Sequence, residues 1–591
     1  MNITQKSEFP RPDFIRDNYI SLNGEWDFDF DDSREIYNSQ QTGKGINLSK
    51  KIKVPFPFQS PESGIDTREQ HTYVCYKKAF NLTSENANKT VLLHFGAVDH
   101  DAEVWVNGTN VGSHSGGYTP FYFNISKLVH YGENELVVYI TDDYRIDQVR
   151  GKQFWETDIK TGCHYDPVTG IWQEVWLEFT DSAYITDVHY ITDFDQNSVK
   201  AVITFNDYVT GDITLDVTLD NEPMAYIKQR VMNKKQAFCT VSFGDYGFQD
   251  NRKILWSPAK PNLFDTTVTL ETENTKDTVD TYFGIRKVET IDDKVYFNNS
   301  QLYSRMILDQ GYWKDGIYRP KTDDGFRQDV QWILDLGFNA ARKHQKIEDP
   351  KFYYWADRLG ILVWGELPSF YGFTDYACID AENTMREFIL RDRNHPSIIA
   401  WVPFNETWGL RKIVGDRREA DFARELYYMC KRMDPERLVS TNDGWENVYP
   451  TDIASVHDYR QIDKNISEYY TNTDFFKTGS GRTGHAYLLP GEKYGGEPIM
   501  ITEFGGKRVQ GGNGWGYEAT IENVEQYVAD IENDINNILN TPTFCGYCYT
   551  QLTDVYQETN GLLDMDRKPK ADVEKLYAIF SRKGRCYKEL N

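Results

Sequence analysis

The sequence predicts a multidomain β and α/β chain: an N-terminal jelly-roll β-sandwich, an immunoglobulin-like β-sandwich and a C-terminal (β/α)8 TIM barrel. Three observations predict this fold class. At 591 residues the chain is too long for one hydrophobic core. Short strand patterns separated by turn residues fill its first half, and apolar strands then alternate with amphipathic helices. We expect domains at residues 1–181, 182–289 and 290–591.

The first two domains are predicted from their short strands. Segments up to about residue 180 are apolar or alternate in polarity, and Asn107-Gly108 is a dipeptide typical of a hairpin turn. This pattern favours a jelly roll. A second set of strands, between Ala183 and Glu289, has the size and strand number of an immunoglobulin-like sandwich.

The barrel is predicted from its alternation of strands and helices. The strand candidates are Leu302–Leu308, Phe338–Arg342, Ile361–Gly365, Ile398–Phe404, Leu438–Thr441, Ile453–His457, Ile499–Glu503 and Phe544–Tyr549. Helix-like segments lie between them, including Asp323–Leu336, Pro350–Leu359, Asp416–Met433, Ile521–Leu539 and Lys570–Ser581. Strands and helices alternating over roughly 300 residues are typical of a (β/α)8 barrel, whose active residues stand where the strands end.

Two of these strands end in glutamate. Glu406 follows the apolar strand Ile398–Phe404, and Glu503 ends the apolar strand Ile499–Glu503. A carboxylate at the end of a buried strand is costly unless the site uses it. Two carboxylates across a barrel mouth suit glycosidic cleavage, in which one protonates the leaving oxygen and the other attacks the sugar or activates water. The alternatives are a metal-dependent hydrolase or isomerase, and structural ion pairs with an arginine such as Arg342.

The sequence contains no compact metal-ligand motif. The candidate ligands His344, His395, His457 and Asp458 do not follow a spacing such as HExxH. The cysteines of CGYC, Cys545 and Cys548, have no second pair nearby. We therefore expect neither a metal nor a cofactor.

The composition of the chain disfavours several classes of binding partner. A net charge of −25 disfavours nucleic acid and anionic membranes, which require clustered lysine and arginine. No apolar segment approaches the roughly 18 residues of a membrane helix, and the N-terminus lacks a signal pattern. We expect a cytoplasmic protein with a carbohydrate partner. Two alternatives are kept: that a signal peptide was trimmed from the chain, and that the protein forms a homo-oligomer.

Long strings in the chain resemble glycoside hydrolase family 2, the family of β-galactosidases, β-glucuronidases and β-mannosidases. Four segments resemble the sugar-binding domain of this family: GEWDF at 24–28, EVWVNG at 103–108, GGYTPF at 116–121 and GIWQEVWLE at 170–178. Its barrel is resembled by residues 342–368, RDRNHPSIIAWVPFNE at 391–406 and ITEFGG at 501–506. The resemblance implies the predicted domain order and a retaining mechanism. It implies Glu406 as general acid/base, Glu503 as nucleophile, and Asn405 as the partner of the sugar 2-hydroxyl.

Further substrate-binding residues are expected at other strand ends. They are Arg342 and His344 on strand two, Trp364 and Glu366 on strand three, His457, Asp458 and Tyr459 on strand six, and Tyr549 on strand eight. Arg342, His344 or Tyr459 could also orient Glu503. Tyr549 stands where the family usually has a tryptophan under the sugar. For each aromatic residue the alternative is barrel core.

The sugar is not determined by the resemblance. The β-glucuronidases carry an Asn-x-Lys pair that holds the uronate carboxylate; here Asn560 is present and Leu562 takes the lysine's place. Lys507 or Arg508 could supply charge instead. The large β-galactosidases have further β domains and an upstream Glu-x-His metal motif, which the chain does not show.

We therefore expect a compact exo-β-glycosidase, with β-galactosidase as the leading interpretation. The alternatives are a β-glucuronidase, a β-mannosidase, an α-L-arabinosidase, an inactive carbohydrate-binding protein or a transglycosylase. The glycine- and tyrosine-rich stretch Thr471–Gly496 is expected to be a loop that shapes the pocket.

Overall fold

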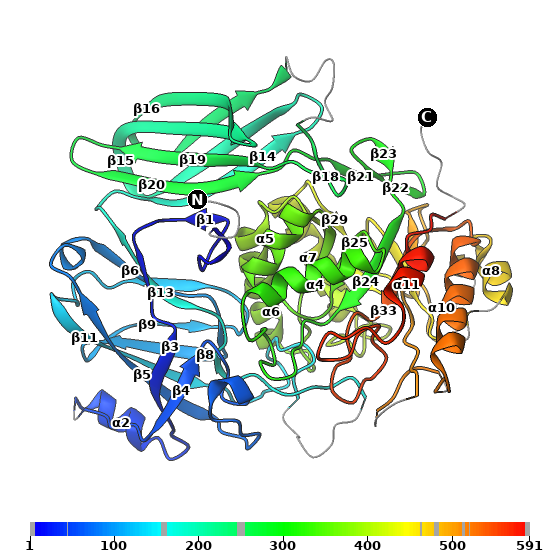
Figure 1. The fold of residues 1–591 in the computed structure, drawn as a ribbon, viewed down its shortest axis with the longest axis horizontal. Helices are drawn as coiled ribbons and strands as arrows, with labels where there is room; N and C mark the ends of the chain where they lie inside the picture. Colours follow the sequence, from blue (N-terminus) through cyan, green and yellow to red (C-terminus); the bar gives the residue numbers. More distant parts are fainter. Residues whose placement is uncertain are drawn as a thin grey trace.

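The computed structural model describes residues 6–43, 45–154, 162–244, 254–460, 462, 464–477, 484–510, 514–518 and 520–584. It confirms the predicted fold class. A jelly-roll sandwich, an immunoglobulin-like sandwich and a (β/α)8 barrel follow one another along the chain, and the second sandwich lies above the other two domains (Figure 1).

The N-terminal sandwich packs two antiparallel sheets around an apolar core. One sheet has the order β4 (Lys50–Val54), β3 (Gly24–Phe30), β5 (Tyr73–Leu82), β11 (Gly132–Thr141), β8 (Asp101–Val106), β9 (Thr109–Ser115). The other has the order β10 (Phe121–Asn124), β6 (Thr90–Phe95), β13 (Val175–Thr180), β2 (Tyr19–Ser21). Asn107 and Gly108 connect β8 to β9 with φ of 49° and 77°, the left-handed conformation that the predicted hairpin turn requires.

The immunoglobulin-like domain is organised by one long hairpin. Its sheet contains β14 (Ile185–Asp193), β15 (Ser198–Leu219), β16 (Glu222–Ser242), β19 (Phe264–Glu271) and β20 (Lys276–Phe283). β15 pairs with β14 through its first half and with β19 through its second half, and register shifts between the halves mark a bend.

A short N-terminal strand joins the two sandwiches. β1 (Phe14–Ile15) pairs antiparallel with β20, although the sequence placed these residues in the first domain. The next residue, Arg16, binds Glu178 of the first sandwich and Asp277 of the second. The predicted boundaries at 181/182 and 289/290 stay predictions.

The barrel is an eight-stranded parallel sheet. In chain order its strands are β24 (Ser304–Asp309), β25 (Ala340–Lys343), β26 (Leu362–Glu366), β27 (Ile398–Val402), β29 (Leu438–Val439), β31 (Ala454–His457), β32 (Ile499–Gly505) and β33 (Phe544–Thr550). β33 pairs with β24, which joins the last strand to the first. The ladder is interrupted between β29 and β31, where the amide of Asp452 donates to the carbonyl of Val439 over 2.8 Å.

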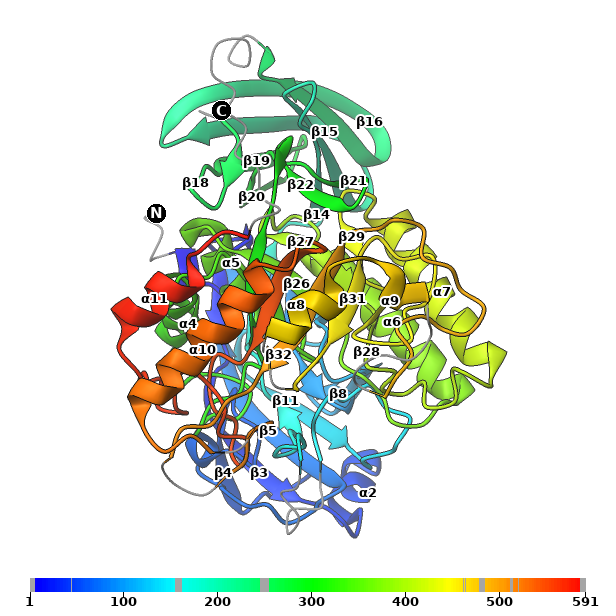
Figure 2. The same ribbon diagram turned by 90° about the vertical axis from the view of Figure 1, so that its right-hand side faces the viewer.

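Helices surround these strands (Figure 2). They are α4 (Asp324–Asp335), α5 (Pro350–Leu359), α6 (Asp375–Asp392), α7 (Arg417–Met433), α8 (Lys464–Tyr470), α10 (Val524–Leu539) and α11 (Val573–Phe580). The helices expected at 350–359, 416–433 and 521–539 lie close to their predicted bounds. The sequence prediction did not name α6, in which the acidic residues Asp380 and Asp392 are buried and interrupt the apolar pattern. Of the described helices, none is both long enough and apolar enough to cross a membrane.

The first sandwich reaches the barrel mouth through the segment between β11 and β12 (Gly170–Ile171). In this segment the amide of Arg150 donates to the carbonyl of Ser369, and the hydroxyl of Tyr165 accepts from Gln310 Nε2 over 2.8 Å. Tyr118 of the sandwich and Tyr318 of the barrel are hydrogen-bonded through their hydroxyls at 2.9 Å. The N-terminal domain therefore contributes residues beside the carboxyl ends of the barrel strands.

Candidate active site

Glu406 and Glu503 face each other at the carboxyl ends of the barrel strands. Glu503 lies in β32, and Glu406 directly follows the short strand β28 (Phe404–Asn405). One carboxylate oxygen of each glutamate and one ring nitrogen of His457 lie within 4.8 Å of one another. The Glu503 side chain is 5% exposed and that of Glu406 is 17% exposed, so both are shielded and the acid/base candidate is the more accessible.

The backbone at Glu406 is held in an unusual conformation. Glu406 and Thr407 have φ of 49° and 57°, a region that non-glycine residues seldom adopt. Two hydrogen bonds to β30 (Asn442–Asp443) hold this turn: Glu406 N donates to Asp443 O over 2.8 Å, and Thr407 N donates to Asn442 Oδ1 over 3.1 Å. The turn directs the Glu406 carboxylate toward His457.

Arg342 links the acidic groups of the site. Its Nη1 donates to Glu503 Oε1 over 3.0 Å and lies 2.9 Å from Asp443 Oδ2. Its Nε donates to Glu366 Oε2 over 2.8 Å, and its Nη2 donates to Asn405 Oδ1 over 2.5 Å. Burial opposes ionisation of Glu503, but the charges of His457 and Arg342 outweigh burial and hold the pKa of Glu503 below its usual value.

His457 stands between both glutamates. Its Nδ1 lies 2.7 Å from Glu406 Oε1 and 3.6 Å from Glu503 Oε2, and its Nε2 lies 3.0 Å from Asp443 Oδ2. Burial lowers the pKa of His457, but Glu503, Asp443 and Glu406 raise it to about 10. At neutral pH the ring is an imidazolium that donates to an oxygen of Glu406 through Nδ1 and to the Asp443 carboxylate through Nε2.

Tyr459 is the second donor to Glu503. Its hydroxyl donates to Glu503 Oε2 over 2.6 Å and lies 2.8 Å from Thr550 Oγ1. The Tyr459 ring stacks on Tyr517 with centroids 3.5 Å apart. Burial and the charge of Glu503 raise the pKa of Tyr459, so the phenol keeps the proton that it donates.

The predicted residues of strands two and three lie behind Glu503. His344 Nδ1 is 3.0 Å from Glu366 Oε1, and burial and the charge of Lys152 lower the pKa of His344. Burial outweighs Arg342 and raises the pKa of Glu366 to about 6. Trp364 is 1% exposed and, by the alternation of β26, shares the interior side of the strand with Glu366.

Two predicted residues point away from the carboxylates. Asp458 is buried and accepts hydrogen bonds from Tyr470 Oη and Arg460 N. The Tyr549 ring packs on Phe504 and on Phe580 of α11, with centroids 5.5 and 5.2 Å apart. Because successive side chains of a strand face opposite sides, Thr550 faces the site and Tyr549 faces the helices. This placement does not support the expected sugar contacts of Asp458 and Tyr549.

The structure also brings to the site several residues that carry no recognisable motif in the sequence. Asp443 joins Arg342 to His457, and Tyr517 stacks on Tyr459. The loop of the first sandwich adds Lys152, whose Nζ lies 5.9 Å from the ring of Trp408. Asp443 sits in a two-residue strand without a motif, and Lys152 belongs to another domain, so no local pattern marked them.

The stretch Thr471–Gly496 is only partly a loop. It contains α9 (Asp474–Lys477), and its residues 478–483 lie outside the described residues. His485 stacks on Trp445 with centroids 4.0 Å apart, and the Trp445 ring lies 5.7 Å from that of His457. This end of the stretch therefore lies next to the site.

The site also has a set of atoms at metal-ligand spacing. Glu406, His457 and Glu503 each offer one such atom. A metal on His457 would have to displace a proton held with a pKa of about 10 and lying between carboxylates. These residues suit an ionised hydrogen-bond network better than a metal, and the expected absence of a metal stays a prediction.

Family models match along the chain in the order of its domains. "Glycosyl hydrolases family 2, sugar binding domain" matches residues 19–178, "Glycosyl hydrolases family 2" matches 183–286, and "Glycosyl hydrolases family 2, TIM barrel domain" matches 291–582. The chain belongs to glycoside hydrolase family 2.

Relatives of this family 2 chain carry two activity names. It is 26% identical over 578 residues to a β-galactosidase of Thermoanaerobacter pseudethanolicus, covering 93% of this chain and 68% of that protein. It is 26% identical over 463 residues to a β-glucuronidase of Bacteroides fragilis, covering 74% and 63%. The chain spans 68%, 53% and 59% of the lengths of three relatives that it matches, a β-galactosidase, a putative β-glucuronidase and a second β-galactosidase.

Solved structures show the shared fold. The structure of a Bifidobacterium dentium β-glucuronidase complexed with coumarin-3-O-glucuronide superposes with a TM-score of 0.78 at 20% identity, covering 96% of this chain and 98% of that one. A β-galacturonidase from Eisenbergiella tayi superposes with a TM-score of 0.73 at 19% identity, covering 97% and 98%.

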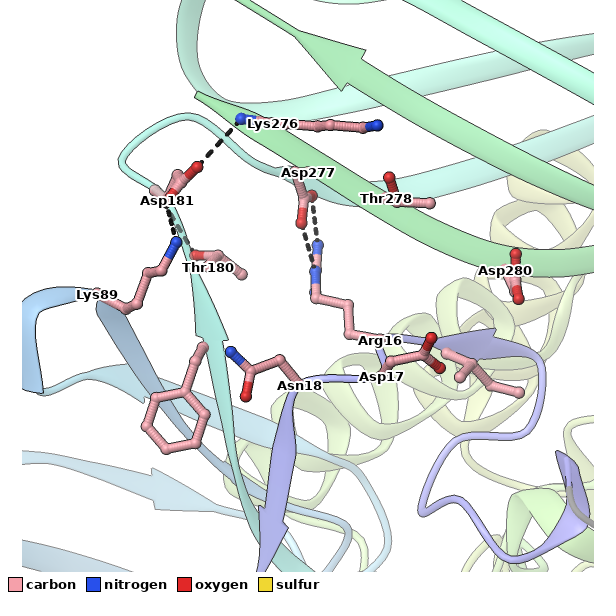
Figure 3. Close-up of a pocket in the computed structure, with 12 residues that line it drawn as sticks. Arg16, Asp17, Asn18, Lys89, Thr180, Asp181, Lys276, Asp277, Thr278 and Asp280 are labelled. Atoms are coloured by element: carbon pink, nitrogen blue, oxygen red, sulfur yellow. Dashed lines mark hydrogen bonds and ion pairs between the residues drawn. The ribbon is translucent and has the colours of Figure 1, made fainter. Parts of the chain in front are cut away.

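A cavity of about 410 Å³ lies between the two sandwiches of this family 2 chain (Figure 3). Several of its charged side chains are paired with one another. Arg16 binds Asp277, Lys89 binds Asp181 over 2.6 Å, and the amide of Lys276 donates to Asp181. This cavity is an ion-paired domain junction and lacks the facing carboxylates of the barrel site.

Proposed function

We propose that the chain is a retaining exo-β-glycosidase that acts by double displacement at Glu406 and Glu503. One observation carries the proposal: an oxygen of each carboxylate lies within 4.8 Å of an oxygen of the other. Retaining sites separate the carboxyl groups by about 5–5.5 Å, whereas inverting sites need about 6.5–9.5 Å to hold a water molecule between them. The short spacing supports direct attack of one carboxylate on the sugar.

The surroundings support distinct roles for the two glutamates. Glu503 receives hydrogen bonds from Arg342 and Tyr459, which favour its ionised form and fix its orientation. It attacks the anomeric carbon while Glu406 gives its proton to the glycosidic oxygen, and a glycosyl ester forms as the aglycone leaves. In the second step Glu406 takes a proton from water, which attacks the anomeric carbon and releases Glu503. The product sugar keeps the β configuration.

Other residues of the site assist these two steps. Asn405 Oδ1 is held by Arg342, which leaves the Asn405 amide group as a donor toward the sugar 2-hydroxyl. His457 contacts both carboxylates and, as an imidazolium, balances their charge as the proton moves. These roles are consistent with the strained turn at Glu406, because strain of this kind concentrates at working residues.

The identity of the sugar is a separate part of the proposal. The sequence favours a β-galactoside, and a β-uronide is the second candidate because relatives carry both names. The Asn-x-Lys position offers no cation: Leu562 is fully buried, and Asn560 Oδ1 accepts from Gln551. Lys507 is paired with Glu518 and Asp534 at 2.8 and 3.0 Å, so it is not available either.

Hydrolysis of a panel of 4-nitrophenyl glycosides tests this function. The panel includes the β-galactoside, β-glucuronide, β-mannoside, β-glucoside and α-L-arabinoside. We expect turnover of at least one β-glycoside, and a fall of at least about 1,000-fold in Glu503→Gln because the nucleophile is lost. Turnover that survives in Glu503→Gln, or none on the whole panel, would contradict the proposal and favour a carbohydrate-binding protein. Product ratios at high acceptor concentration separate hydrolysis from transglycosylation.

A further inference from the structure

Lys152 is a buried lysine that the N-terminal domain places in the wall of the active site. It lies in the segment between β11 and β12 and is 7% exposed. Its Nζ is 5.7 Å from the ring centroid of Tyr165 and 5.9 Å from that of Trp408. Trp408 is tied to the catalytic turn, because its amide donates to the carbonyl of Asn405 over 2.8 Å. The ammonium therefore lies next to the residue pair that carries the acid/base.

Within the part of the chain that the structure describes, the Lys152 ammonium lacks a close anionic partner. Among the described residues no carboxylate lies within ion-pair distance of Nζ, and Nζ donates no hydrogen bond. By contrast, the buried lysines that the structure describes in the barrel are paired with carboxylates at 3.0 Å or less: Lys343, Lys346, Lys351 and Lys507. A shielded ammonium that faces no counter-ion among the described residues is placed to pair with an anion that enters the site.

The neighbouring acidic groups favour the charged form of Lys152 although none of them forms an ion pair with it. Burial lowers the pKa of Lys152, but Cys163, Glu558, Glu503 and Glu406 raise it above its ordinary value. Glu558 accepts hydrogen bonds from Tyr165 Oη and Asn560 Nδ2. Glu503 is held by Arg342 and Tyr459. The cation is therefore present at neutral pH, and none of the described carboxylates is paired with it.

We propose that Lys152 binds a carboxylate of the sugar, so that the substrate class is a β-linked uronide. This inference rests on the proposed function and replaces the neutral sugar that the sequence favoured. An anionic sugar beside Glu406 and Glu503 would be repelled unless a cation faced its carboxylate, and Lys152 supplies that cation from outside the barrel. Lys152 is thus a specificity-determining residue. It pairs with the uronate carboxylate, which Leu562 cannot do because its side chain carries no charge.

Substrate pairs that differ only at C6 test the proposal. They are 4-nitrophenyl β-D-galacturonide against β-D-galactoside, and β-D-glucuronide against β-D-glucoside. We expect the wild-type protein to have the higher kcat/KM on the uronide of at least one pair. Lys152→Met should lower kcat/KM on that uronide by about 100-fold or more and change the neutral partner by less than about 5-fold. Lys152→Arg should restore part of the uronide preference.

The matched control is Arg411→Met. Arg411 stacks on the same Trp408 ring, with its Cζ 5.5 Å from the centroid, but it is exposed. Its loss should leave the ratio of uronide to neutral activity unchanged. A wild-type preference for the neutral sugar in both pairs, or equal losses on both members in Lys152→Met, would overturn the proposal.

Calorimetry separates this inference from the proposed function. D-galacturonate, D-glucuronate, D-galactose and D-glucose are titrated into Glu503→Gln, with and without Lys152→Met. Uronate binding that is lost with Lys152→Met supports the inference even if the wild-type protein hydrolyses none of the four glycosides. Binding of uronates that is unchanged by Lys152→Met, or absent, contradicts it.

Discussion

Arg342 and Glu503 form a fully shielded ion pair, with Nη1 of the arginine 3.0 Å from Oε1 of the glutamate. The same guanidinium also contacts Glu366 and Asp443, and all three acidic side chains are at most 5% exposed. One cation therefore orients the proposed nucleophile and is shared with two further buried carboxylates. This arrangement ties catalysis and stability to the same residue.

Replacing Arg342 should damage both properties. In Arg342→Gln the buried carboxylates lose their common counter-ion, so the free energy of unfolding should fall by about 3–5 kcal/mol. The pKa of Glu503 should rise, because Arg342 is one of the charges that lower it. We expect kcat/KM to fall by about 1,000-fold, measured beside urea unfolding. Arg342→Lys keeps the positive charge but loses the planar guanidinium group. Its kcat/KM should therefore lie between that of the wild-type protein and that of Arg342→Gln. Wild-type kinetics in Arg342→Gln would refute the role.

Removing the hydroxyl of Tyr459 should slow the reaction without unfolding the protein. Tyr459→Phe loses a hydrogen bond to a charged group, worth about 1.5–3 kcal/mol, so kcat/KM should fall by about 10- to 100-fold. The matched control is Tyr517→Phe, which keeps the stacked ring pair and removes a hydroxyl that does not touch Glu503. We expect less than about a 3-fold change in the control. Equal losses in the two variants would point to packing instead.

The loss of kcat/KM on the acidic side of the pH profile, its acid limb, should reflect protonation of Glu366. Its pKa is raised to about 6, so it is ionised at neutral pH and becomes protonated as the pH falls through 6. Protonation weakens its bond to Arg342 Nε and with it the support of Glu503. We expect kcat/KM to fall below pH 6, and Glu366→Gln to show lower activity with this limb flattened. An unchanged limb in Glu366→Gln would assign it to another group.

Metal removal should leave activity unchanged within about 2-fold. His457 carries its second proton up to a pKa of about 10, and both of its nitrogens face carboxylates. A divalent metal would have to displace that proton, so the site should work as a hydrogen-bonded network. Dialysis against EDTA, followed by addition of Mg²⁺, Mn²⁺ or Zn²⁺, tests this expectation. Activity that is lost on dialysis and restored by one metal would overturn it.

The fold and the two glutamates were predictable because parallel strands impose a simple rule. An apolar strand that ends in a carboxylate must bring that carboxylate to the same edge of the barrel as every other strand end. Glu406 and Glu503 therefore could be expected to lie together from strand counting alone. The roles given to them came from the resemblance of their motifs to the family.

The remaining site residues were harder to predict because strand parity and domain packing decide them. His457 faces the site, and the adjacent Asp458 turns to Tyr470. Thr550 faces Tyr459, and the adjacent Tyr549 packs on Phe580. A shift of one residue exchanges the two faces of a strand. The end of a strand is predicted only approximately from the sequence, so the prediction cannot tell which of two adjacent residues faces the site. Lys152 required the packing of one domain on another, which no local pattern encodes.

The central claim is that Glu503 forms a covalent bond with the sugar, and trapping that intermediate tests it most directly. The protein is incubated with a 2-deoxy-2-fluoro-β-glycoside that carries a good leaving group and the sugar preferred in the panel, and its peptides are analysed by mass spectrometry. We predict one added glycosyl residue on Glu503, and none in Glu503→Gln. A label on another residue, or product of inverted configuration with no label at all, would contradict the double displacement.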